Sequence, residues 1–141
     1  MKKLLLICSF LISSLCFGQS IVGEWETYDD ETNELKSIVE IYKKGNLYYG
    51  KINQVLAKKR QELCTVCEGD KKNTPIIGLV IIEKMELNGD EYDDGTILDP
   101  ESGTTYKCLL ALESENKLKV KGYIGIALLG RTQYWLRKNS K

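Results

Sequence analysis

Histidine is absent from this chain of 141 residues. A histidine-based catalytic triad, a histidine-ligated zinc or haem site and a histidine general base are therefore excluded. Carboxylates, tyrosines, lysines and cysteines remain for any chemistry. We expect a protein that is not an enzyme, with no catalytic residue, no metal site and no cofactor.

An excess of charge is also missing, because the 20 basic residues balance the 20 acidic ones. Proteins that bind nucleic acid or an anionic membrane surface usually carry a basic excess. The balance therefore argues against both as partners.

The N-terminal segment has the pattern of a secretory signal peptide. Lys2 and Lys3 precede an apolar run over residues 4–17, and the small residue Gly18 follows. The run is too short to span a membrane. We expect residues 1–19 to be removed, give or take a residue, which places the protein in the periplasm or outside the cell.

A lipid anchor on Cys16 is the alternative to a freely released product. The preceding residue is Leu15, where a small residue is expected, so the soluble secreted form is favoured. The mature chain would then carry a net charge of −2, and we expect no transmembrane segment in it. Residues 20–141 suffice for one domain but not for two.

Hydrophobic periodicity predicts strands over most of the mature chain. The clearest case is the strict alternation from Lys117 to Ile124. Runs rich in valine, isoleucine, tyrosine, threonine and tryptophan predict the other strands. They cover residues 21–28, 35–43, 47–56, 75–83, 104–112 and 131–138, with two short candidates at 84–87 and 96–98. Residues 53–62 offer the one place for a short turn of helix.

Turn residues separate these runs, with Asn88-Gly89 the strongest hairpin signal and Asp99-Pro100 suited to a type I turn. About eight to ten short strands in one small domain are best satisfied by closure, which removes unpaired edges. The predicted fold class is therefore all-β, a small antiparallel up-and-down barrel. An open sandwich of two sheets is the alternative.

Trp25 opens the first predicted strand, within Gly23-Glu24-Trp25. If the first and last strands pair, the guanidinium of Arg131 or Arg137 could lie over its indole ring. This arrangement resembles the barrel-closing kernel of lipocalins. A tryptophan that plugs one end of the core is favoured over one that contacts a ligand.

Cys64 and Cys67 stand in a polar stretch over residues 57–73 that reads as the longest loop. In an oxidising compartment, a disulfide between them is the favoured interpretation. A redox or zinc site lacks its expected context and ligands. Cys108 is expected to be buried and unpaired, although its pairing with Cys64 or Cys67 stays open.

An acidic run spans residues 90–95, but its spacing does not fit a calcium loop. We expect it to form a solvated hairpin turn.

The C-terminal block over residues 122–135 carries three glycines in an apolar strand, as expected where a strand bends or a ligand approaches closely. Residues 124–129 could plug one barrel end or line the mouth of an apolar cavity.

Several motifs occur in order along the mature chain. They are Gly23-x-Trp25, Cys64-x-x-Cys67-x-Gly69, Pro75-Ile76-Ile77-Gly78-Leu79, Asp99-Pro100-x-x-Gly103-x-x-Tyr106 and the block from Gly122 to Trp135. Together they closely resemble the bacterial secreted family of domain of unknown function 2147. The resemblance implies a small exported β-rich domain, akin to lipocalin-like barrels. One departure is Asn33, where family members often carry glycine; asparagine tolerates the left-handed backbone of such a turn.

Two functions follow from this architecture. The first is a barrel that binds a small apolar or amphipathic ligand in the cell envelope, and its candidate ligand-binding residues are Trp25, Asp99, Tyr106, Arg131 and Trp135. The second is a structural or interaction module with a filled core that docks to another envelope protein. An enzyme using Asp99, Tyr106 and Arg131 ranks third. The volume left inside the barrel separates the first two.

Overall fold

Antiparallel strands build almost all of the structure. The computed structural model describes residues 19–58, 61–126 and 130–139, so the predicted signal peptide lies outside the described residues except for Gln19. Within them the chain forms eight strands and one 3₁₀ turn. These are β1 (Gly23–Tyr28), β2 (Leu35–Lys44), β3 (Leu47–Val55), η1 (Gly69–Lys71), β4 (Val80–Asn88), β5 (Glu91–Leu98), β6 (Thr105–Ser114), β7 (Lys117–Tyr123) and β8 (Gly130–Arg137).

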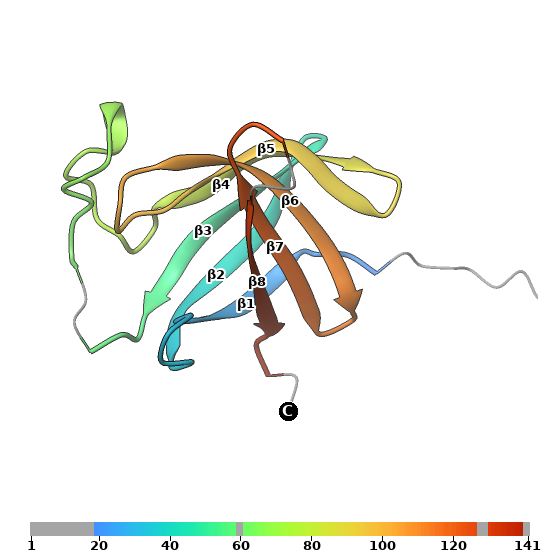
Figure 1. Ribbon diagram of the computed structural model, residues 1–141, viewed down its shortest axis with the longest axis horizontal. Helices are drawn as coiled ribbons and strands as arrows, with labels where there is room; N and C mark the ends of the chain where they lie inside the picture. The colour runs from blue at the N-terminus through green and yellow to red at the C-terminus, as the bar shows by residue number, and fades with distance from the viewer. Residues whose placement is uncertain (1–18, 59–60, 127–129, 140–141) are drawn as a thin grey trace, which may run out of the picture.

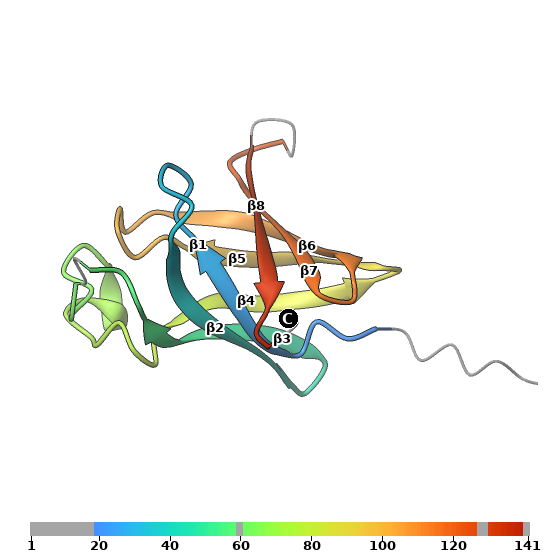
Figure 2. The same ribbon diagram turned by 90° about the horizontal axis from the view of Figure 1, so that it is seen from below.

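Each strand pairs with the next, and β8 returns to β1, so the sheet closes into an up-and-down barrel (Figure 1). The closing seam is short, with Trp25 opposite Arg137 and Glu26 opposite Leu136. Figure 2 shows β1 next to β8 where the barrel closes. The predicted all-β barrel is confirmed, and the open sandwich is not formed.

One strand prediction and one turn prediction were wrong because β-bulges hide strand continuity in the sequence. Residues 75–83 and 84–87 were expected as separate strands, but β4 runs unbroken through Lys84, whose φ is 55°. The acidic run 90–95 was expected as a turn, but it lies mostly in β5. Asp94 has a φ of 59° there, and the register shifts between Tyr92 and Gly95. A bulge adds a residue and disturbs the alternation on which sequence reasoning depends.

The predicted β4–β5 hairpin and the predicted left-handed turn at Asn33 are both formed. The tight hairpin lies where Asn88-Gly89 predicted one, but its two turn residues are Gly89, at a φ of 68°, and Asp90. Asn88 is the last residue of β4 and pairs with Glu91. Asn33 has a φ of 57°, so it does adopt the left-handed backbone expected of it. In residues 53–58 and 61–62, the described part of 53–62, no helix forms.

One end of the barrel is filled. Ile21 and Trp25 are fully buried there, and the indole Nε1 of Trp25 donates to the Ile21 carbonyl at 2.8 Å. The rings of Tyr48 and Tyr92 pack edge to face, 4.8 Å apart between centroids. This is the end that carries the short hairpins, such as β4–β5 at the right of Figure 1. Packed side chains thus close this end, while the buried core continues toward the other end through Ile81, Leu98 and Trp135.

Candidate functional site

The opposite end of the barrel holds a cavity of about 690 Å³, to which all eight strands contribute. In an up-and-down barrel the β1–β2, β3–β4, β5–β6 and β7–β8 connections all emerge at the same end, and the cavity lies at that end. The longest of these connections, residues 56–79, lies at the left of Figure 1. The cavity is therefore bounded by strands below and by irregular segments above.

The walls deep in the cavity are apolar, formed by Ile52, Ile81, Ile97, Val120 and the largely buried indole of Trp135. The polar groups among them are mutually satisfied. The hydroxyls of Thr27 and Ser37 hydrogen-bond each other at 2.6 Å, and Nε1 of Trp135 donates to Oε1 of Gln133 at 3.2 Å. A buried polar group that already has a hydrogen-bond partner does not require a polar group from a ligand.

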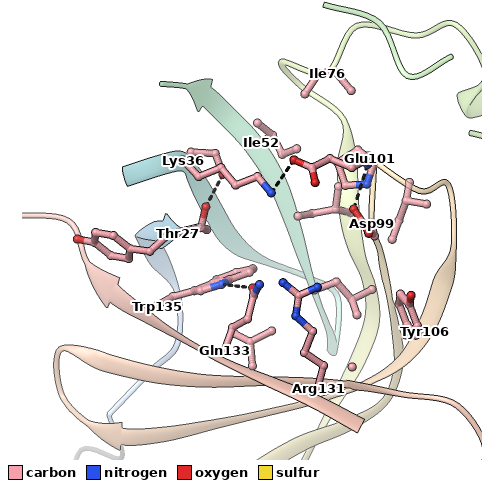
Figure 3. A pocket seen from close by; sticks show the side chains of 18 of the residues that line it. Thr27, Lys36, Ile52, Ile76, Asp99, Glu101, Tyr106, Arg131, Gln133 and Trp135 are labelled. Carbon is pink, nitrogen blue, oxygen red and sulfur yellow. Dashed lines mark hydrogen bonds and ion pairs between the residues drawn. The ribbon is translucent and has the colours of Figure 1, made fainter. Parts of the chain in front are cut away.

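Charged residues gather at the mouth (Figure 3). Lys36 of β2 forms an ion pair with Glu101 of the β5–β6 turn, with 2.7 Å between Nζ and Oε1. Arg131 of β8 pairs with Asp30 of the β1–β2 connection. The amide nitrogen of Gln133 also donates to Asp30, at 3.2 Å. These side-chain contacts tie the β1–β2 connection to β8 and the β5–β6 turn to β2.

Tyr28 also borders the cavity, and its hydroxyl donates to Oε2 of Glu26 at 2.8 Å. Burial and this hydrogen bond to a carboxylate raise the pKa of Tyr28 to about 12. The phenol therefore stays protonated at neutral pH and acts as a neutral donor.

The Cys64–Cys67 disulfide is formed as predicted. Both cysteines are buried, although the segment that carries them lies outside the strands. Sγ of Cys64 lies 3.7 Å from the Pro100 carbonyl oxygen, and a Cβ on Gly103 would stand 2.1 Å from the Val66 carbonyl oxygen. The disulfide segment is thus packed against the β5–β6 turn, which keeps Ile76 at the rim of the cavity.

Four of the five predicted ligand-binding residues line this one cavity: Asp99, Tyr106, Arg131 and Trp135. Three adjacent strands bring Tyr106 and Arg131 to the same wall, with Gly122 of β7 between them. Gly122 is the cross-strand partner of Arg131, and a Cβ placed on it would lie 3.4 Å from Cβ of Tyr106. The glycine leaves open the space between these two side chains.

The carboxylate of Asp99 is engaged by hydrogen bonds within its own turn. Oδ1 accepts the backbone N–H of Glu101 at 3.0 Å, and Oδ2 accepts the hydroxyl of Ser102 at 2.9 Å. This is the common role of aspartate at the first position of a turn. In the suggested catalytic trio of Asp99, Tyr106 and Arg131, the carboxylate thus has a structural role in the turn.

Trp25 does not line the cavity and is placed instead in the filled end. The cation over its ring is Arg137, with Cζ 4.3 Å from the ring centroid, and not Arg131. The reason is register: Trp25 faces Arg137 across the β1–β8 seam, whereas Arg131 lies six residues up the strand toward the mouth. Trp25 thus closes the barrel and does not reach a ligand.

Several cavity residues escaped the sequence analysis. Gln133 could have been found, since it shares the inward face of β8 with Arg131 and Trp135 by simple alternation. Ser37 could also have been found, since it shares a face of β2 with Val39 and Ile41. Lys36 could not, because it is the extra residue at a register shift in the β1–β2 pairing. Ile124 does border the cavity, as residues 124–129 suggested; residues 127–129 lie outside the described residues.

Cys108 is buried in β6 with a free thiol, as expected, and burial raises its pKa to about 12. Among the described residues, no group of three or more cysteine, aspartate and glutamate side chains is placed to hold a metal ion. Nor is there, in that same part of the chain, a helix with the length and apolar character to cross a membrane.

Comparisons with known proteins agree with this architecture. A solved structure described as protein HP1028 from the human pathogen Helicobacter pylori, which belongs to the lipocalin family, superposes with a TM-score of 0.74. The match covers 86% of this chain and 84% of that one at 18% sequence identity, so it shows the fold alone. No curated protein matches the sequence. The family described as an uncharacterized protein conserved in bacteria, DUF2147, matches residues 23–137. The chain therefore belongs to the DUF2147 family, and its fold is a lipocalin-like barrel.

Proposed function

We propose that this protein is a non-catalytic binding protein of the bacterial cell envelope, which holds one small apolar or amphipathic molecule in its barrel. The observation that carries the proposal is the cavity at one end, with its volume of about 690 Å³. Small-molecule sites in proteins have volumes of roughly 300–1,000 Å³ and mostly apolar walls with a few polar groups. Both features are present here.

The chemistry of the walls supports an apolar ligand. Trp135, Ile97 and Val120 present hydrocarbon surface, and the nearby hydroxyls of Thr27 and Ser37 are bonded to each other. Water in such a space has few partners to replace the bonds it makes in bulk solvent. An apolar group that displaces this water gains free energy by removing its own surface from solvent.

Export belongs to the proposal and rests on two features. The N-terminal pattern is that of a signal peptide, and the Cys64–Cys67 disulfide suits an oxidising compartment. Intact-mass analysis of the protein from the envelope of its host tests this point. A mass that begins at Gln19 or Ser20 supports export, whereas a chain that retains residues 1–19 in the cytoplasm contradicts it.

Native mass spectrometry tests ligand binding directly. Protein purified from the periplasm of a near-native host is measured before and after organic extraction. A discrete adduct that extraction removes is the expected result, and its mass gives the ligand class. A clean mature mass, unchanged by extraction and repeated under several growth conditions, would contradict the proposal.

A cavity-filling variant ties the adduct to the barrel. Gly122→Val adds two methyl groups beyond a Cβ that meets only ordinary contacts, so the fold should survive while the space beside Tyr106 is filled. We expect this variant to lose the adduct. Thr132→Val, on the exposed outer face of the neighbouring strand, is the matched control and should keep it.

The alternative function is an interaction module that docks to another envelope protein. Exposed apolar side chains on the segment between β3 and β4 favour it, namely Leu63, Val66 and Ile77. The cavity speaks against the filled core that this alternative assumed. A clean mass before and after extraction would redirect the search toward a protein partner.

A further inference from the structure

The deep part of the cavity specifies which portion of a ligand can enter it. The hydroxyls of Thr27 and Ser37 share one hydrogen bond, and Nε1 of Trp135 donates to Gln133. Each of these side chains thus has a partner, and one hydroxyl proton of the Thr27–Ser37 pair is left over. A polar group of a ligand placed here would lose its hydration and find few partners to replace it. The buried portion of the ligand is therefore apolar.

The charges at the mouth are not equivalent. Lys36 and Glu101 neutralise each other, and Asp99 is engaged in its own turn. Arg131 is different, because its partner Asp30 is not part of the cavity wall. That contact uses one of the three guanidinium nitrogens, whereas a guanidinium has five N–H donors. In Figure 3 the Arg131 side chain rises from β8 into the cavity beside Gln133.

The space beside Arg131 is open because of Gly122. A side chain at this position would project between Tyr106 and Arg131, and glycine removes it. The hydroxyl of Tyr106 makes no hydrogen bond to any residue that the structure describes. Arg131 and Tyr106 both line the cavity, from β8 and β6, and both carry hydrogen-bond donors (Figure 3).

We propose that the cavity takes a single-chain amphiphile with an anionic head group, which binds Arg131 in exchange for the carboxylate of Asp30 and accepts a second hydrogen bond from Tyr106. This inference rests on the proposed function and specifies its ligand. Carboxylate and phosphate heads share the chemistry that a guanidinium recognises. A cavity of this size holds one such molecule, with its chain among the apolar walls.

The exchange at Arg131 is energetically accessible. The Arg131 side chain is 66% exposed in its pair with Asp30, and exposed ion pairs contribute little to stability. A ligand head that competes with Asp30 forms the same kind of charge-assisted hydrogen bond, and its apolar chain adds free energy by leaving water. Asp30 therefore acts as an internal competitor that the ligand displaces.

The test uses the chain from Gln19 onward and its tryptophan fluorescence, to which Trp135 in the cavity wall and Trp25 in the filled end both contribute. Four probes are titrated below their aggregation concentrations: dodecanoate, dodecyl phosphate, dodecanol and dodecyltrimethylammonium. We expect both anions to bind about tenfold more tightly than dodecanol, as one charge-assisted hydrogen bond provides. The cationic probe should bind most weakly. The ratio between dodecanoate and dodecyl phosphate distinguishes a fatty-acid-type head from a phosphate head.

Variants assign the effect to the named residues. Arg131→Gln should reduce dodecanoate affinity about tenfold, to that of dodecanol, without changing dodecanol binding. Asp30→Asn should increase dodecanoate affinity severalfold, because the competitor is neutralised; a merely structural role for Asp30 would not produce an increase. Lys44→Gln removes the same charge at an exposed position at the filled end and should change nothing.

The outcomes separate this inference from the proposed function. If dodecanol and dodecanoate bind equally well and Arg131→Gln changes neither, the cavity binds apolar molecules and the anionic head is wrong. If the cationic probe binds most tightly, the acidic residues of the mouth dominate and the inference is overturned. If no probe binds while circular dichroism shows folded protein, both proposals fall.

Discussion

Arg137 lies over the ring of Trp25, with its guanidinium carbon 4.3 Å from the ring centroid. The same guanidinium donates to three backbone carbonyls, those of Glu115 through Nε, Val22 through Nη1 and Ser20 through Nη2. One side chain on the last strand thus holds the N-terminal segment and the β6–β7 turn against the filled end of the barrel.

Replacing Arg137 should therefore destabilise the protein. Arg137→Ala removes the three hydrogen bonds and the contact with Trp25, and we expect a loss of about 2 kcal/mol in the free energy of unfolding. Arg131→Ala removes only an exposed ion pair and should cost about 0.5 kcal/mol or less. Urea unfolding measures both. Equal losses for the two variants would show that Arg137 does not have this structural role.

The Cys64–Cys67 disulfide should contribute modestly to stability, because it closes a very short loop. The chain-entropy relation gives about 2 kcal/mol for a loop of this size. Cys64→Ser/Cys67→Ser should lower the melting temperature while the β-sheet signal in circular dichroism is retained. Loss of the folded state altogether would mean that the disulfide segment is required for barrel closure.

Cys108 should be unreactive in the folded protein. Its thiol is fully buried, and burial raises its pKa to about 12. In the folded chain from Gln19 onward, a thiol reagent at pH 8 should label no cysteine. After denaturation without reductant it should label one, Cys108, because Cys64 and Cys67 stay bonded. Labelling of two or more after denaturation would contradict the disulfide, and Cys108→Ala should abolish the signal.

The same thiol makes stability depend on alkaline pH. Because its pKa is higher in the folded state than the ordinary value of 9.0, the protonated form is favoured by folding. Its contribution is complete below pH 9 and is lost as the pH rises toward 12. Urea unfolding across this range should show stability falling, and Cys108→Ala should fall less steeply. Parallel curves would exclude Cys108 as a cause.

Substitution by alanine should destabilise the protein much more at Gly95 than at Gly122. A Cβ on Gly95 would lie 2.4 Å from the Glu83 carbonyl oxygen and 2.8 Å from the backbone nitrogen of Met85. Backbone atoms of a paired strand cannot move aside without distorting the sheet. Gly95→Ala should therefore lower the free energy of unfolding by about 3 kcal/mol or more. Gly122→Ala meets its neighbours at 3.4 Å, an ordinary contact, and should change stability by less than about 1 kcal/mol.

Chemical denaturation of both alanine variants makes this comparison. A tolerated Gly95→Ala would mean that β4 and β5 are farther apart at the bulge than described.

The sequence by itself determined most of the strands, the β4–β5 hairpin and the Cys64–Cys67 bond, since these depend on neighbours within a few residues. It misjudged β4 and β5, where bulges interrupt the alternation. It also placed Asp99, Tyr106, Arg131 and Trp135 among the candidate residues, and these meet at one cavity. The common location follows from strand alternation and from the polarity of an up-and-down barrel.

Only the tertiary structure decided which end is hollow and which arginine covers Trp25. Bulges at Lys84 and Asp94 change which residues of β4 and β5 face the interior, and no local sequence pattern predicts these bulges. The choice of Arg137 over Arg131 depends on the register of β1 against β8, which pair across more than a hundred residues of chain. Closure of the barrel is a non-local event, so it fixes the cavity, whereas local patterns fix only the strands that surround it.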